Sequence, residues 1–172
     1  MAHRLLLLRH AKSDWSRALP DSRRPLNPRG QRDAELLGKW IAAHELPPPA
    51  RILASPAARV RETLERLLPA AGWNAARLIW EDNLYLADAG CLLQIVHSLP
   101  NDLDRVMLAG HNPGLENLLQ RLADTAVPPT DKGKIFTTAN LACLEGPESW
   151  SQWGRKRAHL DCLLRPRELD MP

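Results

Sequence analysis

Three short apolar segments, each followed by a stretch with helical periodicity, constrain the fold of this 172-residue chain most strongly. The segments cover residues 4–8, 51–54 and 105–109, and turn-forming residues bound each of them. Such segments are typical of buried strands. Strands that alternate with helices along a chain form a largely parallel sheet with helices on its faces. The sequence therefore predicts an α/β fold.

Each expected helix carries one apolar face. Apolar side chains recur at spacings of three and four in three stretches, as they do on the buried side of an amphipathic helix. These residues are Ala34, Leu37 and Ile41, then Val60, Leu64 and Leu67, and then Leu92, Ile95, Val96 and Leu99. Two later strands are expected at residues 139–144 and 159–164, where they would extend the sheet.

The length of the chain fits one domain, which we expect to span residues 1–166. Three consecutive prolines at residues 47–49 form a stiff connector, and the proline- and glycine-containing stretch at 128–133 predicts an exposed loop. Neither stretch is long enough to mark a domain boundary. Residues 167–172 contain few apolar side chains, so they are expected to form a short C-terminal tail.

The composition argues against a membrane or exported protein. No apolar stretch approaches the roughly 20 residues that a membrane helix needs, and the N-terminus lacks the features of a signal peptide. The three cysteines, at positions 91, 143 and 162, lie far apart without a Cys-x-x-Cys spacing. This pattern predicts free thiols in a reducing compartment rather than a disulfide framework. We therefore expect a soluble, cytoplasmic protein.

The charge pattern argues against a nucleic-acid partner. The formal net charge is +3, but basic and acidic residues alternate along the chain. The single tyrosine and single phenylalanine offer little surface on which bases can stack. The basic side chains therefore need another explanation. The sequence does not indicate an oligomeric state.

Polar residues follow all three apolar segments. Arg9 and His10 end the first segment, a Ser-Pro pair at residues 55–56 follows the second, and Gly-His-Asn-Pro at residues 110–113 follows the third. Ligands of open parallel sheets bind beyond the carboxyl ends of the strands, so residues from all three positions can meet there.

The serine and asparagine that precede prolines at this edge predict helix starts. Ser55 and Asn112 each have the order expected of an N-cap followed by a first helical residue without an N–H group. Two helices are then expected to direct their unpaired N–H groups and the positive ends of their dipoles toward the same space. Such an edge favours an anion.

Four cationic or titratable side chains are expected at the same edge: Arg9, His10, Arg59 and His111. Arg59 falls in the first turn after Ser55, where a cation opposes the helix dipole. The four groups would repel one another unless an anion lies among them. Guanidinium groups match phosphate oxygens, and a neutral imidazole can act as a nucleophile. The pattern therefore predicts a phosphate site.

Other interpretations of these residues are weaker. His10 can be an ordinary strand-end residue, and His111 can be a turn residue that bonds its own loop. A zinc site lacks a convincing third ligand, and two nearby arginines would repel a dication. A serine hydrolase would need a Gly-x-Ser-x-Gly elbow, which is absent. We expect neither a metal nor another cofactor.

Several motifs resemble one known family. The segments LLLLRHAKSDW, RPLNPRGQRDAELLGKW, ILASPAARVRET, NLY and VMLAGHNPGLENLL are similar to SixA-like phosphohistidine phosphatases of the histidine phosphatase, or phosphoglycerate mutase-like, superfamily. The resemblance runs in order from about residue 4 to about residue 122. It implies a three-layer α/β/α sandwich with a mostly parallel central sheet and a phosphohistidine enzyme intermediate.

The resemblance also implies roles for individual residues. His10 would attack phosphorus in line, while Arg9, Arg59 and His111 would bind the equatorial oxygens and stabilise the transition state. Water would then release orthophosphate. Arg24 resembles a family arginine that approaches the site, so it is either a further phosphate contact or a solvated loop arginine.

The acid that protonates the leaving group is not assigned. Glu81, Asp82 and Asp14 are candidates, and each can also be an ordinary surface carboxylate. Lys12 adds positive potential, but its spacing requires no role.

No long insertion that would cap the site is visible in the sequence, so a shallow, open site is expected. Such a site suits a phosphohistidine or another phosphomonoester, including a phosphorylated side chain of another protein. The alternative is a phospho-ligand binding or regulatory module with little turnover. A mutase would need more lid material to exclude water.

Overall fold

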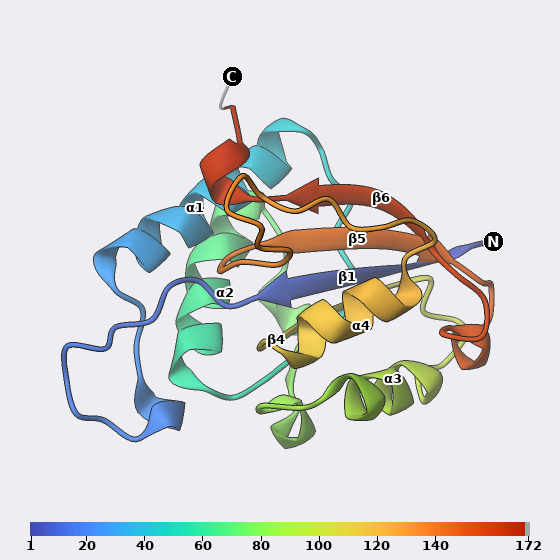
Figure 1. The fold of residues 1–172 in the computed structure, drawn as a ribbon, viewed down its shortest axis with the longest axis horizontal. Helices are drawn as coiled ribbons and strands as arrows, with labels where there is room; N and C mark the ends of the chain where they lie inside the picture. Colours follow the sequence, from blue (N-terminus) through green and yellow to red (C-terminus); the bar gives the residue numbers. More distant parts are fainter. Residues whose placement is uncertain (171–172) are drawn as a thin grey trace.

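The computed structural model describes residues 1–170, which form a central sheet between two pairs of helices (Figure 1). The sheet has six strands in the order β3-β2-β4-β1-β5-β6. β5 runs antiparallel to both of its neighbours, and the other adjacent strands are parallel. The strands are β1 (His3–Arg9), β2 (Arg51–Ala54), β3 (Leu78–Trp80), β4 (Arg105–Gly110), β5 (Leu141–Gly146) and β6 (His159–Leu164). The predicted α/β sandwich with a mostly parallel sheet is confirmed.

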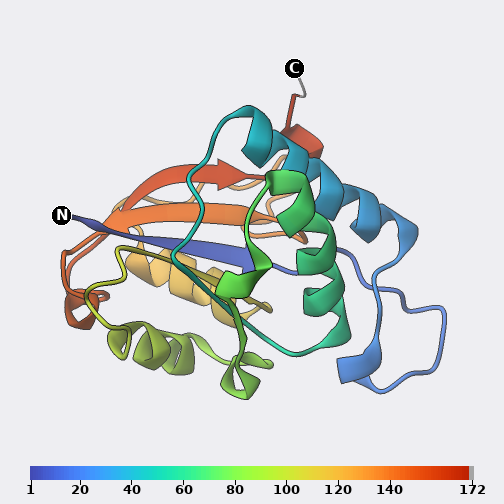
Figure 2. The same ribbon diagram turned by 180° about the vertical axis from the view of Figure 1, so that it is seen from behind.

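The four α-helices cover the two faces of the sheet in pairs. α1 (Pro28–Ala43) and α2 (Ala58–Ala71) pack against each other on one face, as the reverse view shows (Figure 2). α3 (Ala89–His97) and α4 (Gly114–Leu122) cover the other face, toward the viewer in Figure 1. Both faces of the sheet are therefore shielded from water, as parallel strands require.

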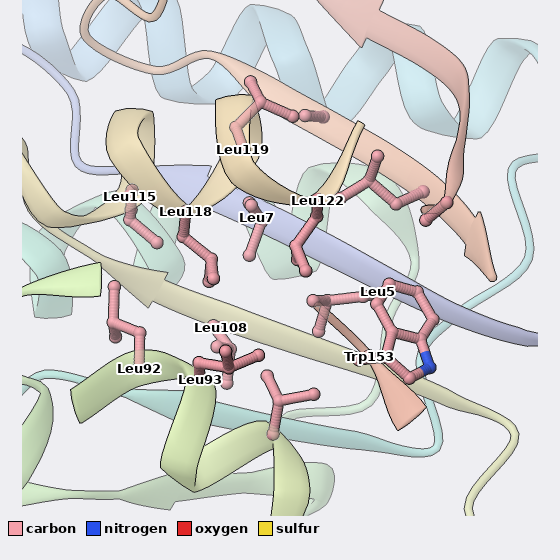
Figure 3. Close-up of a cluster of buried hydrophobic side chains, with 14 of the residues drawn as sticks. Leu5, Leu7, Leu92, Leu93, Leu108, Leu115, Leu118, Leu119, Leu122 and Trp153 are labelled. Atoms are coloured by element: carbon pink, nitrogen blue, oxygen red, sulfur yellow. The ribbon is translucent and has the colours of Figure 1, made fainter. Parts of the chain in front are cut away.

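Alternating side chains of β1 divide the core between these two layers. Leu5 and Leu7 pack with the leucines of α3 and α4 (Figure 3), whereas Leu6 and Leu8 pack with α1 and α2. Each of these four side chains is at most 3% exposed. A run of four leucines thus serves both layers, since successive side chains of a strand point to opposite faces.

Two strands differ from the expectation. β3 was not predicted; it is an edge strand whose apolar run is only three residues long, and Ile79 and Trp80 in it are exposed. β5 begins at Leu141 rather than at residue 139. Ala139 has a φ of 60°, in the left-handed region, and cannot continue a strand there. The strand predicted at residues 159–164 is confirmed.

The two helix caps predicted at the sheet edge, Ser55 and Asn112, are wrong. A capping side chain is found at the start of α1, where Asn27 accepts a hydrogen bond from Gly30 N at 2.8 Å. In contrast, α2 begins at Ala58 and α4 begins at Gly114. Ser55 and Asn112 therefore lie before the cap positions. The Ser55 hydroxyl bonds His111, and the Asn112 amide donates to Phe136 O in the loop before β5.

The C-terminal residues return to the sandwich. A 3₁₀ turn at Pro166–Glu168, η5, packs against α1. Of the tail expected at 167–172, residues 171 and 172 lie outside the described residues. Within residues 1–170, no helix is both long and apolar enough to cross a bilayer.

Candidate active site

The candidate site lies where β1, β2 and β4 end side by side. These three strands are adjacent and parallel, so the residues that follow them emerge at one edge of the sheet. The backbone continues the pairing for one further step: His10 N donates to Gly110 O at 3.1 Å, and Ser55 N donates to Ala109 O at 3.0 Å. The structure thereby brings His10, Ser55 and His111 to the same edge.

His10 is held in one tautomer. Its Nδ1 lies 2.7 Å from Ala11 O, and a carbonyl oxygen only accepts, so Nδ1 carries the proton. The lone pair is then on Nε2. Burial lowers the pKa of His10 to about 3, and the nearby His111, Arg59 and Arg9 act in the same direction. His10 is therefore a neutral imidazole whose Nε2 carries an unprotonated lone pair at physiological pH.

His111 lies next to His10, with 5.3 Å between the ring centroids. Its Nδ1 accepts from Arg59 Nη2 at 3.2 Å, because a guanidinium only donates. Its Nε2 then carries the proton and donates to Ser55 Oγ at 2.7 Å. Burial, together with the charge of Arg59, lowers the pKa of His111 to about 4. Ser55, expected as a helix cap, instead orients this second histidine.

Arg59 is buried at the start of α2 and is paired with a carboxylate from a distant loop. Its Nη1 donates to Asp21 O at 2.8 Å, and its Nη2 donates to Asp21 Oδ2 at 3.0 Å. The Tyr85 hydroxyl donates to the same carboxylate oxygen at 2.5 Å. These hydrogen bonds, with that from Tyr85 first, lower the pKa of Asp21. The Arg59 guanidinium therefore already binds an anionic group of the chain itself, the Asp21 carboxylate.

Arg9 approaches the site from the side of the loop between α4 and β5. Its Nη1 donates to Phe136 O at 3.0 Å, and Asn112 Nδ2 donates to the same oxygen at 2.7 Å. The Glu116 carboxylate accepts from Phe136 N at 3.1 Å. Burial lowers the pKa of Arg9, and the charge of Glu116 opposes that effect. This network fixes one guanidinium nitrogen of Arg9 against the loop.

Arg24 and Lys12 lie at the rim. Arg24 Nε is 3.8 Å from Asp21 Oδ1, and its guanidinium stacks over the ring of Trp15 at 3.9 Å. Asp21 therefore lies between Arg24 and Arg59 and interacts with both. Lys12 O accepts from Asn27 N at 2.9 Å, which ties the segment after His10 to the start of α1.

The three candidate leaving-group acids are not drawn into this network. Among residues 1–170, no hydrogen bond or ion pair joins the carboxylates of Glu81, Asp82 or Asp14 to His10 or His111. The Asp14 carboxylate instead accepts from Ser16 N at 2.8 Å, and its pKa is lowered by that residue. No group of three histidine, cysteine, aspartate or glutamate side chains in the described part of the chain is arranged to hold a metal ion.

Sequence reasoning missed Asp21, Tyr85 and the role of Ser55. Tyr85 lies within the NLY motif, which contributed to the family resemblance but did not indicate what Tyr85 contacts. Asp21 belongs to η1 (Asp21–Arg23), a 3₁₀ turn in a loop with no apolar pattern. Its position opposite Arg59 depends on contacts between residues 38 positions apart, which no local pattern reveals.

Known proteins share this sequence and fold. Residues 5–92 match the histidine phosphatase superfamily, branch 1. A protein of Mycobacterium tuberculosis is 32% identical over 149 residues, which cover 84% of this chain and 90% of that protein. The chain belongs to the histidine phosphatase superfamily. A chloroplastic protein of Arabidopsis thaliana is 30% identical over 163 residues, covering 88% of this histidine phosphatase and 71% of the plant protein.

Solved structures of related proteins share this fold. The crystal structure of the candidate phosphohistidine phosphatase SixA from Agrobacterium tumefaciens is 29% identical, with a TM-score of 0.77, and covers 95% of this histidine phosphatase and 98% of that chain. The protein histidine phosphatase SixA in complex with tungstate shares the fold, with a TM-score of 0.79 at 23% identity over 97% of this chain and 99% of the other. Within its superfamily, this phosphatase is SixA-like.

Proposed function

We propose that this protein hydrolyses a phosphohistidine or another phosphomonoester through a phosphohistidine intermediate on His10. The state of His10 carries this proposal. Its Nδ1 proton is directed at Ala11 O, so the lone pair of Nε2 is free to attack phosphorus. With a pKa of about 3, the imidazole stays neutral and available at any physiological pH.

The neighbouring cations would bind the phosphoryl group. The charges of Arg59 and Arg9 disfavour the protonated form of His10, and the same charges would attract a phosphoryl group bound at Nε2. An incoming phosphoryl dianion would draw the Arg59 guanidinium away from His111 Nδ1 and raise the pKa of His111. Nδ1 would then take up a proton from solvent, and the resulting N–H group would donate a hydrogen bond to an equatorial oxygen. Because these groups supply the positive charge, the reaction needs no metal ion.

The reaction has two displacement steps. In the first, the bond from His10 Nε2 to phosphorus forms as the bond from phosphorus to the leaving group breaks. In the second, a water oxygen attacks phosphorus, the N–P bond breaks, and orthophosphate leaves with the water proton passing to solvent. A phosphorylated histidine of another protein in the cytoplasm is one substrate of this class.

Phosphate release in EDTA tests the proposal. We expect the wild type to hydrolyse para-nitrophenyl phosphate and phosphohistidine peptides without added metal, and His10→Ala to have no activity. The matched control is His159→Ala, at an exposed histidine on β6. A rapid quench in base is expected to trap phosphate on the peptide that contains His10.

Other outcomes have definite meanings. If the wild type releases no phosphate from any phosphoester or phosphoramidate but binds vanadate, the protein is a phospho-ligand binding module. Loss of wild-type activity in EDTA contradicts the metal-free mechanism.

A further inference from the structure

A cleft opens beside the candidate site. Its volume is about 620 Å³, within the range of roughly 300–1,000 Å³ that is common for small-molecule sites. The start of α1, the loop at residues 128–140 and η5 form its walls, and Arg9 and Lys12 line the side nearest His10. The shallow site expected from the sequence is thus extended by a concave surface.

The cleft carries a strong excess of positive charge. Seven basic and three acidic side chains line it. Two of the acids already have partners, since Asp33 lies 3.8 Å from Arg29 and Glu168 lies 3.4 Å from Arg165. Among the lining acids, Asp131 alone has no partner, and it faces five cations that form no ion pair within residues 1–170; Glu116, outside the lining, acts on one of them, Arg9. These cations are Arg9, Lys12, Lys132, Lys134 and Arg167.

Hydrogen bonds fix the walls of the cleft. The buried Arg165 donates through Nη2 to Pro128 O and to Ile135 O, which holds the loop and η5 together. In Figure 1 the orange loop that precedes β5 passes close to the red turn of η5, beyond the end of β6. Arg9 ties the other end of the loop through Phe136 O. The cations therefore surround a preformed space, which lowers the entropic cost of binding.

The lining favours a small, hydroxylated ligand over a protein surface. Protein interfaces are centred on aromatic and large apolar side chains, but Pro166 is the one apolar residue among the described residues that line this cleft. No aromatic ring is present among them to stack on a base. Instead, short polar side chains lie between the cations: Thr130, Thr137, Thr138 and Asn140.

We propose that the cleft binds a second phosphate of the substrate, and that the preferred substrate is a small polyol carrying two or more phosphates. This inference rests on the proposed phosphatase function, because one phosphate must lie at His10 while the other meets the cleft. Lys132 and Lys134 then act as specificity residues, and Arg9 lies between the two phosphate positions.

Matched substrates test the inference. Butanediol bisphosphate and butanediol monophosphate differ only in the second phosphate. We expect the wild type to prefer the bisphosphate by roughly tenfold or more in kcat/KM. The double variant Lys132→Ala/Lys134→Ala should reduce this ratio to near one. Both lysines are exposed, so folding is retained.

The control variant removes the same charge elsewhere. Lys39→Ala/Lys156→Ala changes two exposed lysines outside the cleft and should keep the wild-type ratio. Calorimetry with butane bisphosphonate and butyl phosphonate gives a second readout, because neither compound is hydrolysed. Tighter binding of the bisphosphonate should depend on Lys132 and Lys134.

These measurements separate the two hypotheses. If para-nitrophenyl phosphate is hydrolysed but the bisphosphate has no advantage, the cleft proposal is wrong and the phosphatase stands. If nothing is hydrolysed but the bisphosphonate preference depends on the two lysines, the phosphatase proposal fails and the second-phosphate site stands. Preference for a phosphorylated acidic peptide over both butanediol phosphates overturns the small-molecule assignment in favour of a protein partner.

Discussion

At the scale of single residues, His10 and His111 lose their ordinary ability to take up a proton. An unfolded histidine has a pKa of about 6.5, whereas the pKa values in the folded protein are about 3 and about 4. Above pH 6.5 both states are neutral, so the two histidines do not affect stability there. As the pH falls below 6.5 only the unfolded chain binds these protons, and the folded state is destabilised.

This proton uptake predicts the pH dependence of stability. Between about pH 6 and pH 5, the free energy of unfolding should fall by up to about 1.4 kcal/mol per pH unit for each of the two histidines. His10→Gln removes one of these contributions, so its curve should be flatter than that of the wild type. Urea unfolding at several pH values measures both. Parallel curves would show that His10 titrates normally in the folded protein.

Arg59 combines a proposed catalytic role with several contacts in the fold. Arg59→Ala should lower kcat by about 10²–10³, the cost of removing a donor to the transition state. It should also cost about 1–3 kcal/mol of stability, since buried partners at Asp21 and His111 lose their donor. Steady-state kinetics with urea unfolding checks both effects.

Arg61→Ala is the control for that variant. Arg61 lies two residues further along α2, but it is exposed and covers the ring of Trp80 at 4.2 Å. It should retain wild-type kcat. Equal losses of activity in the two variants would mean that Arg59 acts only through the stability of α2.

At the scale of elements, the sequence was most informative where burial is complete. β1, β2 and β4 are apolar because helices cover both of their faces, so short runs of Leu, Ile, Val and Met revealed them. β3 was not predicted because its apolar run, Leu78–Trp80, has only three residues and lies partly exposed at the edge of the sheet. The cap positions failed because Ser55 serves His111, a contact made across the sheet rather than along the chain.

The difference between buried strands and irregular segments also explains which residues of the candidate site could be predicted from the sequence. Arg9, His10 and His111 lie at the ends of β1 and β4, which the apolar pattern of the sequence predicts. Because these strands are parallel, their carboxyl ends lie together, and the three residues are expected to meet there. Asp21 and Tyr85 come from irregular segments, whose positions depend on tertiary contacts alone. Asp21, which binds Arg59 in the folded chain, and the contact between Asp21 and Tyr85 were therefore beyond sequence analysis.

Close packing of α1 against the segment after His10 gives a test at the element scale. A Cβ added at Gly30 would lie 2.2 Å from Lys12 O, so Gly30→Ala must displace that segment. We expect a loss of about 1–3 kcal/mol in stability, with reduced turnover. In Gly90→Ala the nearest atom lies 3.3 Å away on the Asp88 side chain, so this control should be neutral or slightly stabilising. Urea unfolding and kcat distinguish them, and equal stability of both variants would contradict the packing argument.

At the scale of the whole molecule, the shared sheet should make residues 1–166 unfold as one domain. Leu7 and Leu8 are fully buried on opposite faces, so Leu7→Ala and Leu8→Ala should each cost about 2–5 kcal/mol. Each should shift one common transition, followed both by tryptophan fluorescence and by circular dichroism. Separate transitions for the two faces would disprove a single domain.

The central place of β1 also affects how the molecule moves. β1 lies between β4 and β5 with both faces buried, and its backbone amides should exchange with deuterium only on global unfolding. His10 directly follows this strand, whereas Lys132 and Lys134 expose their side chains on a loop whose backbone is held by Arg165 and Arg9. Substrate thus meets a nucleophile held in a fixed position, while the exposed lysine side chains beside it change rotamer within picoseconds to nanoseconds.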